Sequence, residues 1–231
     1  MSQRVLRAAT VIAVGAWCLI VSSVEVPAAA AGRVTGRVRV VARASRRLAT
    51  PGAYPDRNVN IARPASAAEA ENVVVFVKVP PRPTVPVAGA AMRQEGEEFL
   101  PHLLAVTTGT SVEFPNADAV FHNVFSLSGA ATFDLGRYPL GTSRSRTFTK
   151  PGLAKVYCHL HSQMAGLIRV FDHPYFTIPD RTGRFAIPEL PPAGYDVVAW
   201  HERIGEVTHH ITVTEGQATD VFFDLPLAGE Q

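Results

Sequence analysis

Three side chains able to bind a soft metal ion lie within seven residues of this chain. They are Cys158, His161 and Met164, in the spacing Cys-x-x-His-x-x-Met. A further imidazole, that of His122, lies upstream in the sequence Phe-His-Asn-Val-Phe. A fold that uses all four must place the segment around residue 122 beside the loop that follows residue 157. This pattern constrains the fold more strongly than the composition does.

The four side chains together indicate copper. One thiolate, two imidazoles and a weakly bound thioether form the ligand set of blue-copper electron-transfer sites. Cu(I) prefers sulfur and Cu(II) accepts imidazole nitrogen, so this mixed set suits both oxidation states. We therefore expect one copper ion, bound by His122, Cys158, His161 and Met164.

Each of these residues also has a purely structural interpretation. His122 could be an ordinary loop histidine, Cys158 an inert buried thiol, and Met164 a filler of the apolar core. The remaining histidines are not expected to bind metal. His159 should point away from the ion because it lies between two ligands, and adjacent histidines on one strand face opposite sides of a sheet.

The N-terminus predicts secretion. Arg4 and Arg7 precede a mostly apolar stretch, residues 8–24, and small residues suited to cleavage follow it. We expect residues 1–31 to be a cleaved signal peptide, the mature protein to be periplasmic, and no membrane span to remain. The alternative is a transmembrane anchor, for which the apolar run is short.

Cleavage leaves Cys158 as the only cysteine, because Cys18 lies inside the signal. A single cysteine in an oxidising compartment cannot form an internal disulfide, so metal binding is the obvious purpose. The presence of a single cysteine also excludes a two-copper thiolate centre, which needs two bridging cysteines. The mature chain carries 20 basic and 19 acidic side chains, once Arg4, Arg7 and Glu25 are removed. This balance gives no argument for binding nucleic acid.

The chain after residue 31 favours strands, and no stretch has a convincing helical period. Apolar residues make up 47% and charged residues 18% of the sequence, which fits a globular β-rich protein. Residues 42–71 are expected to form a long loop, and residues 92–99 a single strand. A turn at Lys150–Gly152 predicts a hairpin, with strands at 147–148 and 154–157. A second turn is expected between strands at 176–178 and 184–187.

The segments with the four predicted ligands resemble the cupredoxin family, over residues 90–171. In that family a His-Asn pair follows one strand, and the other ligands lie on one loop after a Tyr-Cys strand end. The resemblance implies an all-β fold with a Greek-key β-sandwich. It also implies that Asn123 links the two ligand segments by hydrogen bonds, and that His161 presents its ring edge to solvent. Ser162 departs from the proline that short-loop relatives often carry.

A second resemblance begins near residue 175. Gly183-x-Phe185-x-Ile187, followed by Leu190-Pro-Pro-x-Gly194, is similar to carboxypeptidase regulatory-like domains, which are small β-sandwiches. The first strands of such a domain resemble residues before 80, so we expect the copper domain to be inserted into the sandwich. The alternative is two sequential domains. The expected boundaries are 1–31 for the signal peptide, 32–80 and 173–228 for the regulatory-like sandwich, and 88–172 for the copper domain.

The resulting hypothesis is a secreted mononuclear copper protein that carries single electrons. Redox protein partners are expected to dock near His161, where Leu160 adds an apolar contact. Two alternatives remain, a copper-binding or delivery protein and an adhesion or scaffold module with an incidental copper site. Enzyme activity is not expected, because the sequence offers no second histidine cluster for a metal site with an open position.

Overall fold

The computed structural model describes residues 30–42 and 67–227 of the chain. The predicted signal peptide therefore lies almost wholly outside the described residues, as do residue 228 and positions 43–66 of the expected loop. In the described ranges, no helix has both the length and the apolar character needed to cross a membrane.

Strands dominate the described residues, so the predicted all-β fold class is confirmed. The elements are β1 (Gly32–Ala42), a 3-10 helix η1 (Ala67–Asn72), β2 (Val73–Val77), β3 (Arg93–Glu95), β4 (Glu98–Leu100), β5 (Leu103–Thr107), β6 (Thr110–Pro115), β7 (His122–Ser128), β8 (Ala131–Tyr138), β9 (Ser143–Phe148), β10 (Gly152–Tyr157), β11 (Ala165–Phe171), β12 (Phe176–Thr177), β13 (Arg184–Leu190), β14 (Ala193–His201), β15 (Gly205–Val213) and β16 (Ala218–Leu227).

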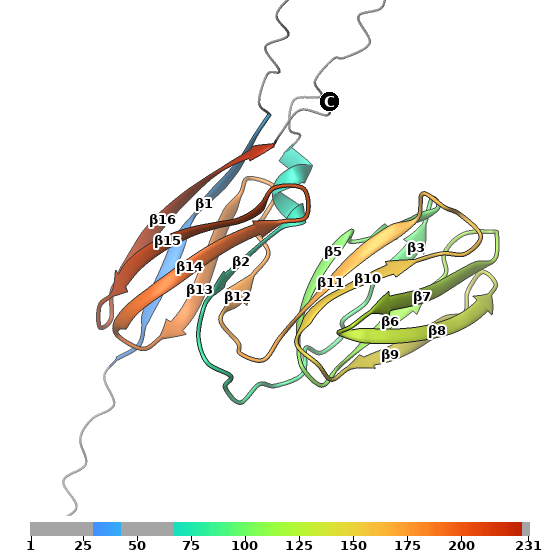
Figure 1. Ribbon diagram of the computed structural model, residues 1–231, viewed down its shortest axis with the longest axis horizontal. Coiled ribbons are helices and arrows are strands. Elements are labelled where there is room, and N and C mark those ends of the chain that lie inside the picture. Colours follow the sequence, from blue (N-terminus) through green and yellow to red (C-terminus); the bar gives the residue numbers. More distant parts are fainter. Residues whose placement is uncertain (1–29, 43–66, 228–231) are drawn as a thin grey trace, which may run out of the picture.

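Two groups of strands lie side by side along the long axis of the molecule (Figure 1). The central unit consists of β3 to β11. Its largest sheet has the order β5-β11-β10-β7-β8, and β6 pairs with β9 across the core from it. Large apolar side chains fill the space between them, among them Phe114, Val124, Phe148 and Ile168.

The companion unit consists of β1, β2 and β12 to β16. It has two sheets, ordered β13-β1-β16 and β12-β2-β14-β15. β1 therefore pairs with two strands that come more than 140 residues later, antiparallel to β13 and parallel to β16. Its interior is built mostly from valine, phenylalanine and leucine, for example Val38, Phe223 and Leu190.

The strand β2 is apolar at every position because both of its faces are covered. Val73, Val75 and Val77 point into the core of the companion unit. Val74 and Phe76 point the other way, into a third apolar cluster with residues of β5, β11 and β14. Strands that are buried on both faces lose the apolar–polar alternation of a half-buried strand. This third cluster joins the companion unit to the central unit.

The chain crosses between the two units twice, and the two crossings are hydrogen-bonded to each other. The Arg82 N–H group donates to the Asp172 carbonyl at 2.8 Å, and the Val77 N–H group donates to the Tyr175 carbonyl at 3.0 Å. The segment that enters the central unit thus starts beside the segment that leaves it (Figure 1). The guanidinium of Arg169 adds contacts across the junction, lying over the rings of Phe76 and Trp200.

Two expectations about strands are wrong. Residues 92–99 form not one strand but the hairpin β3–β4, because Gly96 and Glu97 both adopt a left-handed backbone, at φ 65° and 57°. β9 and β10 do not form a hairpin, since β9 pairs with β6 while β10 pairs with β7 and β11. The expected strands on either side of the second turn are present as β12 and β13, and the turn connects two sheets because β12 pairs with β2 and β13 with β1.

Candidate metal centre

The structure brings His122, Cys158 and His161 together at one end of the central unit. The Sγ atom of Cys158 lies 3.9 Å from Nδ1 of His122 and 3.7 Å from Nδ1 of His161. The three donor atoms all lie within 4.8 Å of one another. The two imidazole rings are arranged edge to face, with their centroids 4.8 Å apart. Two imidazole nitrogens and one sulfur thus face a common point.

Two neighbouring strands hold these residues in place. His122 is the first residue of β7, and Cys158 directly follows β10, which pairs with β7 through Tyr157 and Phe125. The strands of a sheet lie about 4.8 Å apart, so residues at adjacent strand ends come close without any adjustment of the loops. His122 and Cys158 are therefore fixed by the sheet itself.

His161 is placed by the short loop between β10 and β11. β10 pairs along its full length with β11, up to Tyr157 and Ala165, so residues 158–164 must close tightly. The Met164 N–H group donates to the His161 carbonyl at 3.1 Å, and the Cys158 N–H group donates to the Met164 carbonyl at 3.3 Å. The hydrogen bonds inside the loop make a compact turn that returns the His161 ring towards Cys158.

The outward nitrogen of His122 contacts a carboxylate. Its Nε2 lies 2.7 Å from Oδ2 of Asp118, and because a carboxylate only accepts, the ring must carry its proton on Nε2. In the neutral ring this leaves the lone pair on Nδ1, the atom that faces Cys158. Histidine ligands are commonly oriented by such a partner on the other ring nitrogen.

Asp118 is itself held by the turn between β3 and β4. The N–H groups of Gly96 and Glu97 donate to its two carboxylate oxygens at 2.7 and 3.0 Å. Desolvation works to raise the pKa of Asp118, but these two N–H groups and the His122 ring outweigh it and keep that pKa below its usual range. Asp118 is therefore a negative charge at neutral pH.

The two histidines differ in exposure. The His122 side chain is fully buried, whereas 19% of the His161 side chain is accessible to solvent. The Nε2 atom of His161 has a looser acidic neighbour, Oε1 of Glu97 at 3.8 Å. The other Glu97 oxygen accepts a hydrogen bond from Gln163 at 2.8 Å. His161 is thus the one of the two rings that reaches the surface.

Asn123 connects the two segments that carry the donors. Its Oδ1 accepts a hydrogen bond from the His159 N–H group at 3.4 Å, and its Nδ2 donates to Asp134 at 2.6 Å. The side chain is buried. It is therefore placed to hold the strand end at His122 against the loop at Cys158, in the role expected from the sequence.

Met164 is buried, with 1% of its surface exposed, and packs in the core cluster that also contains Cys158. Its backbone is tied into the loop by the hydrogen bonds given above. Its role as an axial ligand remains a prediction.

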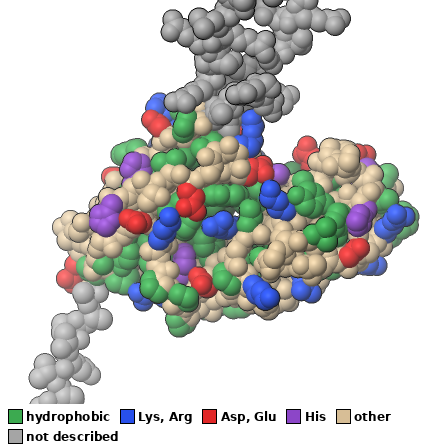
Figure 2. Space-filling model, viewed as in Figure 1, with side chains coloured by type: hydrophobic (Ala, Val, Ile, Leu, Met, Phe, Trp, Pro, Cys, Tyr) green, Lys and Arg blue, Asp and Glu red, His purple; other side chains and the backbone are tan. Residues whose placement is uncertain are grey.

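Other histidines lie away from the donor group. His159 stacks flat on Phe125, with ring centroids 3.7 Å apart, and half of its side chain is exposed. His102 bonds the Ala165 carbonyl and Glu202. Histidine side chains reach the surface of both units (Figure 2), so histidine alone does not mark the site.

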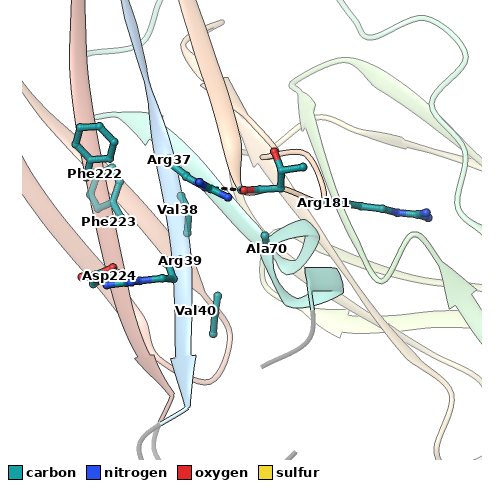
Figure 3. A pocket seen from close by; sticks show the side chains of 11 residues that line it. Arg37, Val38, Arg39, Val40, Ala70, Arg181, Phe222, Phe223 and Asp224 are labelled. Carbon is teal, nitrogen blue, oxygen red and sulfur yellow. Dashed lines mark hydrogen bonds and ion pairs between the residues drawn. The ribbon is translucent and has the colours of Figure 1, made fainter. Parts of the chain in front are cut away.

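A groove on the companion unit offers no alternative centre for copper. It lies between β1, β16, η1 and the turn before β13, and Figure 3 shows Arg37, Arg39 and Arg181 among the side chains that line it. Arg39 pairs with Asp224, and Arg37 donates to the Thr182 carbonyl. Among the described residues around this groove there is neither a histidine nor a cysteine.

The donor set of the centre fits one copper ion. A thiolate with two imidazoles is the strongly bound part of a blue-copper ligand set. Among the described residues this is the one group of histidine, cysteine and acidic side chains close enough together to hold a metal ion, and it contains a single sulfur donor from cysteine. These residues therefore fit one ion rather than a thiolate-bridged pair.

Sequence reasoning missed Asp118 and Glu97. Asp118 stands four residues before His122, which was visible, but nothing local indicated that its carboxylate turns back to the ring. Glu97 lies 64 residues before His161, and only the β3–β4 hairpin brings it near.

The sequence matches no protein-family model, and no curated protein sequence matches it. Several solved structures are similar to part of the chain. A purple cupredoxin from Nitrosopumilus maritimus is 26% identical with a TM-score of 0.33, and the match covers 36% of this chain and 99% of that one. A reduced variant of amicyanin is 24% identical with a TM-score of 0.34, and covers 42% of this chain and 99% of its own.

A further match is a copper-containing nitrite reductase from Thermus scotoductus SA-01. It is 29% identical with a TM-score of 0.35, over 42% of this chain and 25% of the reductase. These matches are to copper proteins, but each covers well under half of this chain and the TM-scores are low. The assignment of the centre therefore rests on its own side chains.

Proposed function

We propose that this chain is a secreted, periplasmic, mononuclear copper protein that carries single electrons between redox partners. The observation that carries the proposal is the convergence of Nδ1 of His122, Nδ1 of His161 and Sγ of Cys158 within 4.8 Å. Copper, when bound, would supply a one-electron couple between Cu(I) and Cu(II). Met164 is proposed as the weak fourth ligand.

The residues around the donors favour electron transfer because they limit movement. His122 is fixed by β7 and by Asp118, Cys158 by the end of β10, and Asn123 connects the two segments. A ligand set that holds its geometry in both oxidation states keeps the reorganisation on electron transfer small. Burial of His122, Cys158 and Met164 also keeps water away from three of the four donors.

His161 is the proposed route for electrons to and from a partner. It is the exposed histidine of the pair, and Leu160 beside it is 39% exposed. Phe121, directly before His122, is 55% exposed. Redox encounters are small and weak, so a modest apolar surface around the exposed ring would suffice for docking. The chain is proposed to be a carrier and not an enzyme.

The central unit is proposed to be an insertion in a regulatory-like β-sandwich. The pairing of β1 with β13 and β16, and of β2 with β12 and β14, supports this organisation. Close, hydrogen-bonded crossings at Arg82 and Asp172 support it too, because insertions are tolerated where both ends of the inserted domain lie together. A fragment of residues 173–231 should then not fold alone, and cooperative unfolding of that fragment would contradict the proposal.

The experiment that tests the function is a redox titration of the copper-loaded protein, followed by its visible absorption. A carrier should keep its copper through repeated cycles of reduction and oxidation, and a Cu(II)–thiolate absorption band should return in full each time. A protein that binds Cu(I) but loses the ion on oxidation would instead be a copper-delivery protein. A protein that shows no band and no tight copper binding would contradict both functions.

A further inference from the structure

We infer that Asp118 is a positioning residue that favours Cu(II) over Cu(I) at the centre, through its contact with His122. This inference rests on the proposed function, since it concerns the same copper site. It adds a residue that no ligand pattern in the sequence contains.

The first argument is the contact itself. Oδ2 of Asp118 lies 2.7 Å from Nε2 of His122, a short, charge-assisted hydrogen bond. It requires the proton on Nε2 and so directs the lone pair of Nδ1 at the point that Cys158 and His161 also face. A carboxylate on the outer nitrogen also makes the imidazole a more basic ligand.

The second argument is that the contact is rigid. Asp118 is only 16% exposed, and its two oxygens accept the N–H groups of Gly96 and Glu97. Both turn residues adopt the left-handed backbone, which is sterically unfavourable for Glu97 because it has a side chain. This conformation points both N–H groups at one carboxylate. The turn therefore holds a negative charge against His122 in a fixed place.

The third argument is electrostatic. A fixed negative charge close to the site attracts the doubly charged copper ion more strongly than the singly charged one. Little solvent lies between Asp118 and the fully buried ring, so screening is weaker than at the surface. The consequence is a lower reduction potential than the same ligands would give without Asp118.

Glu97 provides an internal comparison. Its carboxylate lies 3.8 Å from Nε2 of His161, beyond hydrogen-bond distance, and its side chain is 47% exposed. Charge that is exposed and not directly bonded interacts weakly. Glu97 should therefore affect the potential in the same direction as Asp118, but by less.

The test uses the full copper-loaded protein and three variants that each remove one negative charge: Asp118→Asn, Glu97→Gln and Glu98→Gln. Glu98 is the matched control, because it is exposed on the same hairpin and contacts neither histidine. Asp118→Asn should weaken Cu(II) binding about 10- to 100-fold, the usual effect of losing such a partner. Each tenfold weakening of Cu(II) relative to Cu(I) raises the potential by about 59 mV.

The expected order of the rise in potential is Asp118→Asn, then Glu97→Gln, then Glu98→Gln. A potential for Asp118→Asn that equals that of the Glu98→Gln control would overturn the inference. The proposed function would survive that result, provided that the wild-type protein shows its Cu(II)–thiolate band. Absence of the band from the wild-type protein would instead defeat the proposed function.

A second measurement needs neither copper nor a variant. Nitrogen-15 NMR of the metal-free wild-type protein at pH 8 reports which nitrogen of His122 carries a proton. We expect the proton on Nε2 and none on Nδ1. A proton on Nδ1 of His122 would overturn the inference, whatever the variants show.

Discussion

Two pairs of histidines in this protein each include a buried ring but face different partners. In the central unit, Nδ1 of His122 and Nδ1 of His161 face the Cys158 sulfur. Near the junction with the companion unit, Nδ1 of His173 and Nδ1 of His201 each accept a backbone N–H bond at 3.2 Å, from the residue two positions later. Burial alone therefore does not distinguish a metal ligand from a structural histidine.

The two pairs differ in the group that each Nδ1 atom contacts. His173 and His201 are 5% and 1% exposed, and the Nδ1 atom of each accepts a hydrogen bond from its local turn. The Nε2 atom of His201 also lies 3.9 Å from Oε2 of Glu69. His122 is equally buried, but its Nε2 is bonded to Asp118, so the other nitrogen stays directed at the thiol. In this protein the sulfur near Nδ1 is what the two candidate ligands share and what His173 and His201 lack. The predictions below use this contrast.

The largest effect should follow from removing the sulfur that His122 and His161 face. We expect Cys158→Ser to abolish the Cu(II)–thiolate absorption completely, because a hydroxyl cannot replace the thiolate as a soft donor. The control is His201→Gln, which changes a buried histidine that does not face the sulfur and should keep the band. An unchanged band in Cys158→Ser would refute the site.

The next effect separates the two candidate ligands from each other. His122→Gly and His161→Gly should each lose the band, but added imidazole should restore it only in His161→Gly. The His161 ring is 19% exposed, so its removal opens the site to solvent, whereas His122 is fully enclosed. Absorption spectra with and without imidazole decide this. Restoration in His122→Gly alone would show that the assignment of the exposed ligand is reversed.

His173 and His201 should make the free energy of unfolding depend on pH. Burial lowers the pKa of His173 and of His201. At His173 the charge of Asp172 opposes this shift. At His201 the charges of Glu69 and Glu202 oppose it, whereas Arg203 and His102 lower the pKa further. Below the ordinary value of about 6.5 the unfolded chain then binds more protons than the folded one. Stability contributed by these rings is present above that value and is lost as the pH falls.

Urea unfolding of the metal-free protein at pH 7.5 and 5.5 measures this effect. We expect the free energy of unfolding to fall between these values, and to fall less in the double variant His173→Gln, His201→Gln. Carboxylates contribute little to the change because they titrate lower. An equal fall in wild type and variant would show that the two rings do not carry the pH dependence.

The smallest effect should come from Met164. Replacement by leucine conserves volume, so the fold should lose less than about 1.5 kcal/mol. If the thioether is the weak axial ligand, Met164→Leu should retain copper and raise the reduction potential. Metal analysis and a redox titration measure both quantities. Complete loss of copper from the folded variant would mean that Met164 is a primary ligand.

The donors could be predicted from the sequence because their chemistry is local. Cys158, His161 and Met164 lie on one short loop, so their spacing predicts that the side chains converge. The structure brings Cys158 and His161 together, while the convergence of Met164 stays a prediction. The predicted strand end before Cys158 is also present, as β10. Such features depend on residues close in the sequence.

What could not be predicted depends on long-range choices. The Asp118 contacts with Gly96 and Glu97 join positions 22 and 21 residues apart and need a left-handed residue other than glycine, which no propensity favours. The expected hairpin of β9 and β10 failed for a related reason. Its turn was recognisable from the sequence. β10 nevertheless pairs with β7 and β11, because strand pairing depends on contacts across the whole sheet.

The most direct test of the central claim is a titration of the mature metal-free protein with Cu(II), followed by visible absorption and elemental analysis. One copper ion bound by His122, Cys158 and His161 predicts an intense Cu(II)–thiolate band that grows linearly and stops at one copper per chain. A titration that produces no such band, or two coppers per chain that are both lost in Cys158→Ser, would contradict it.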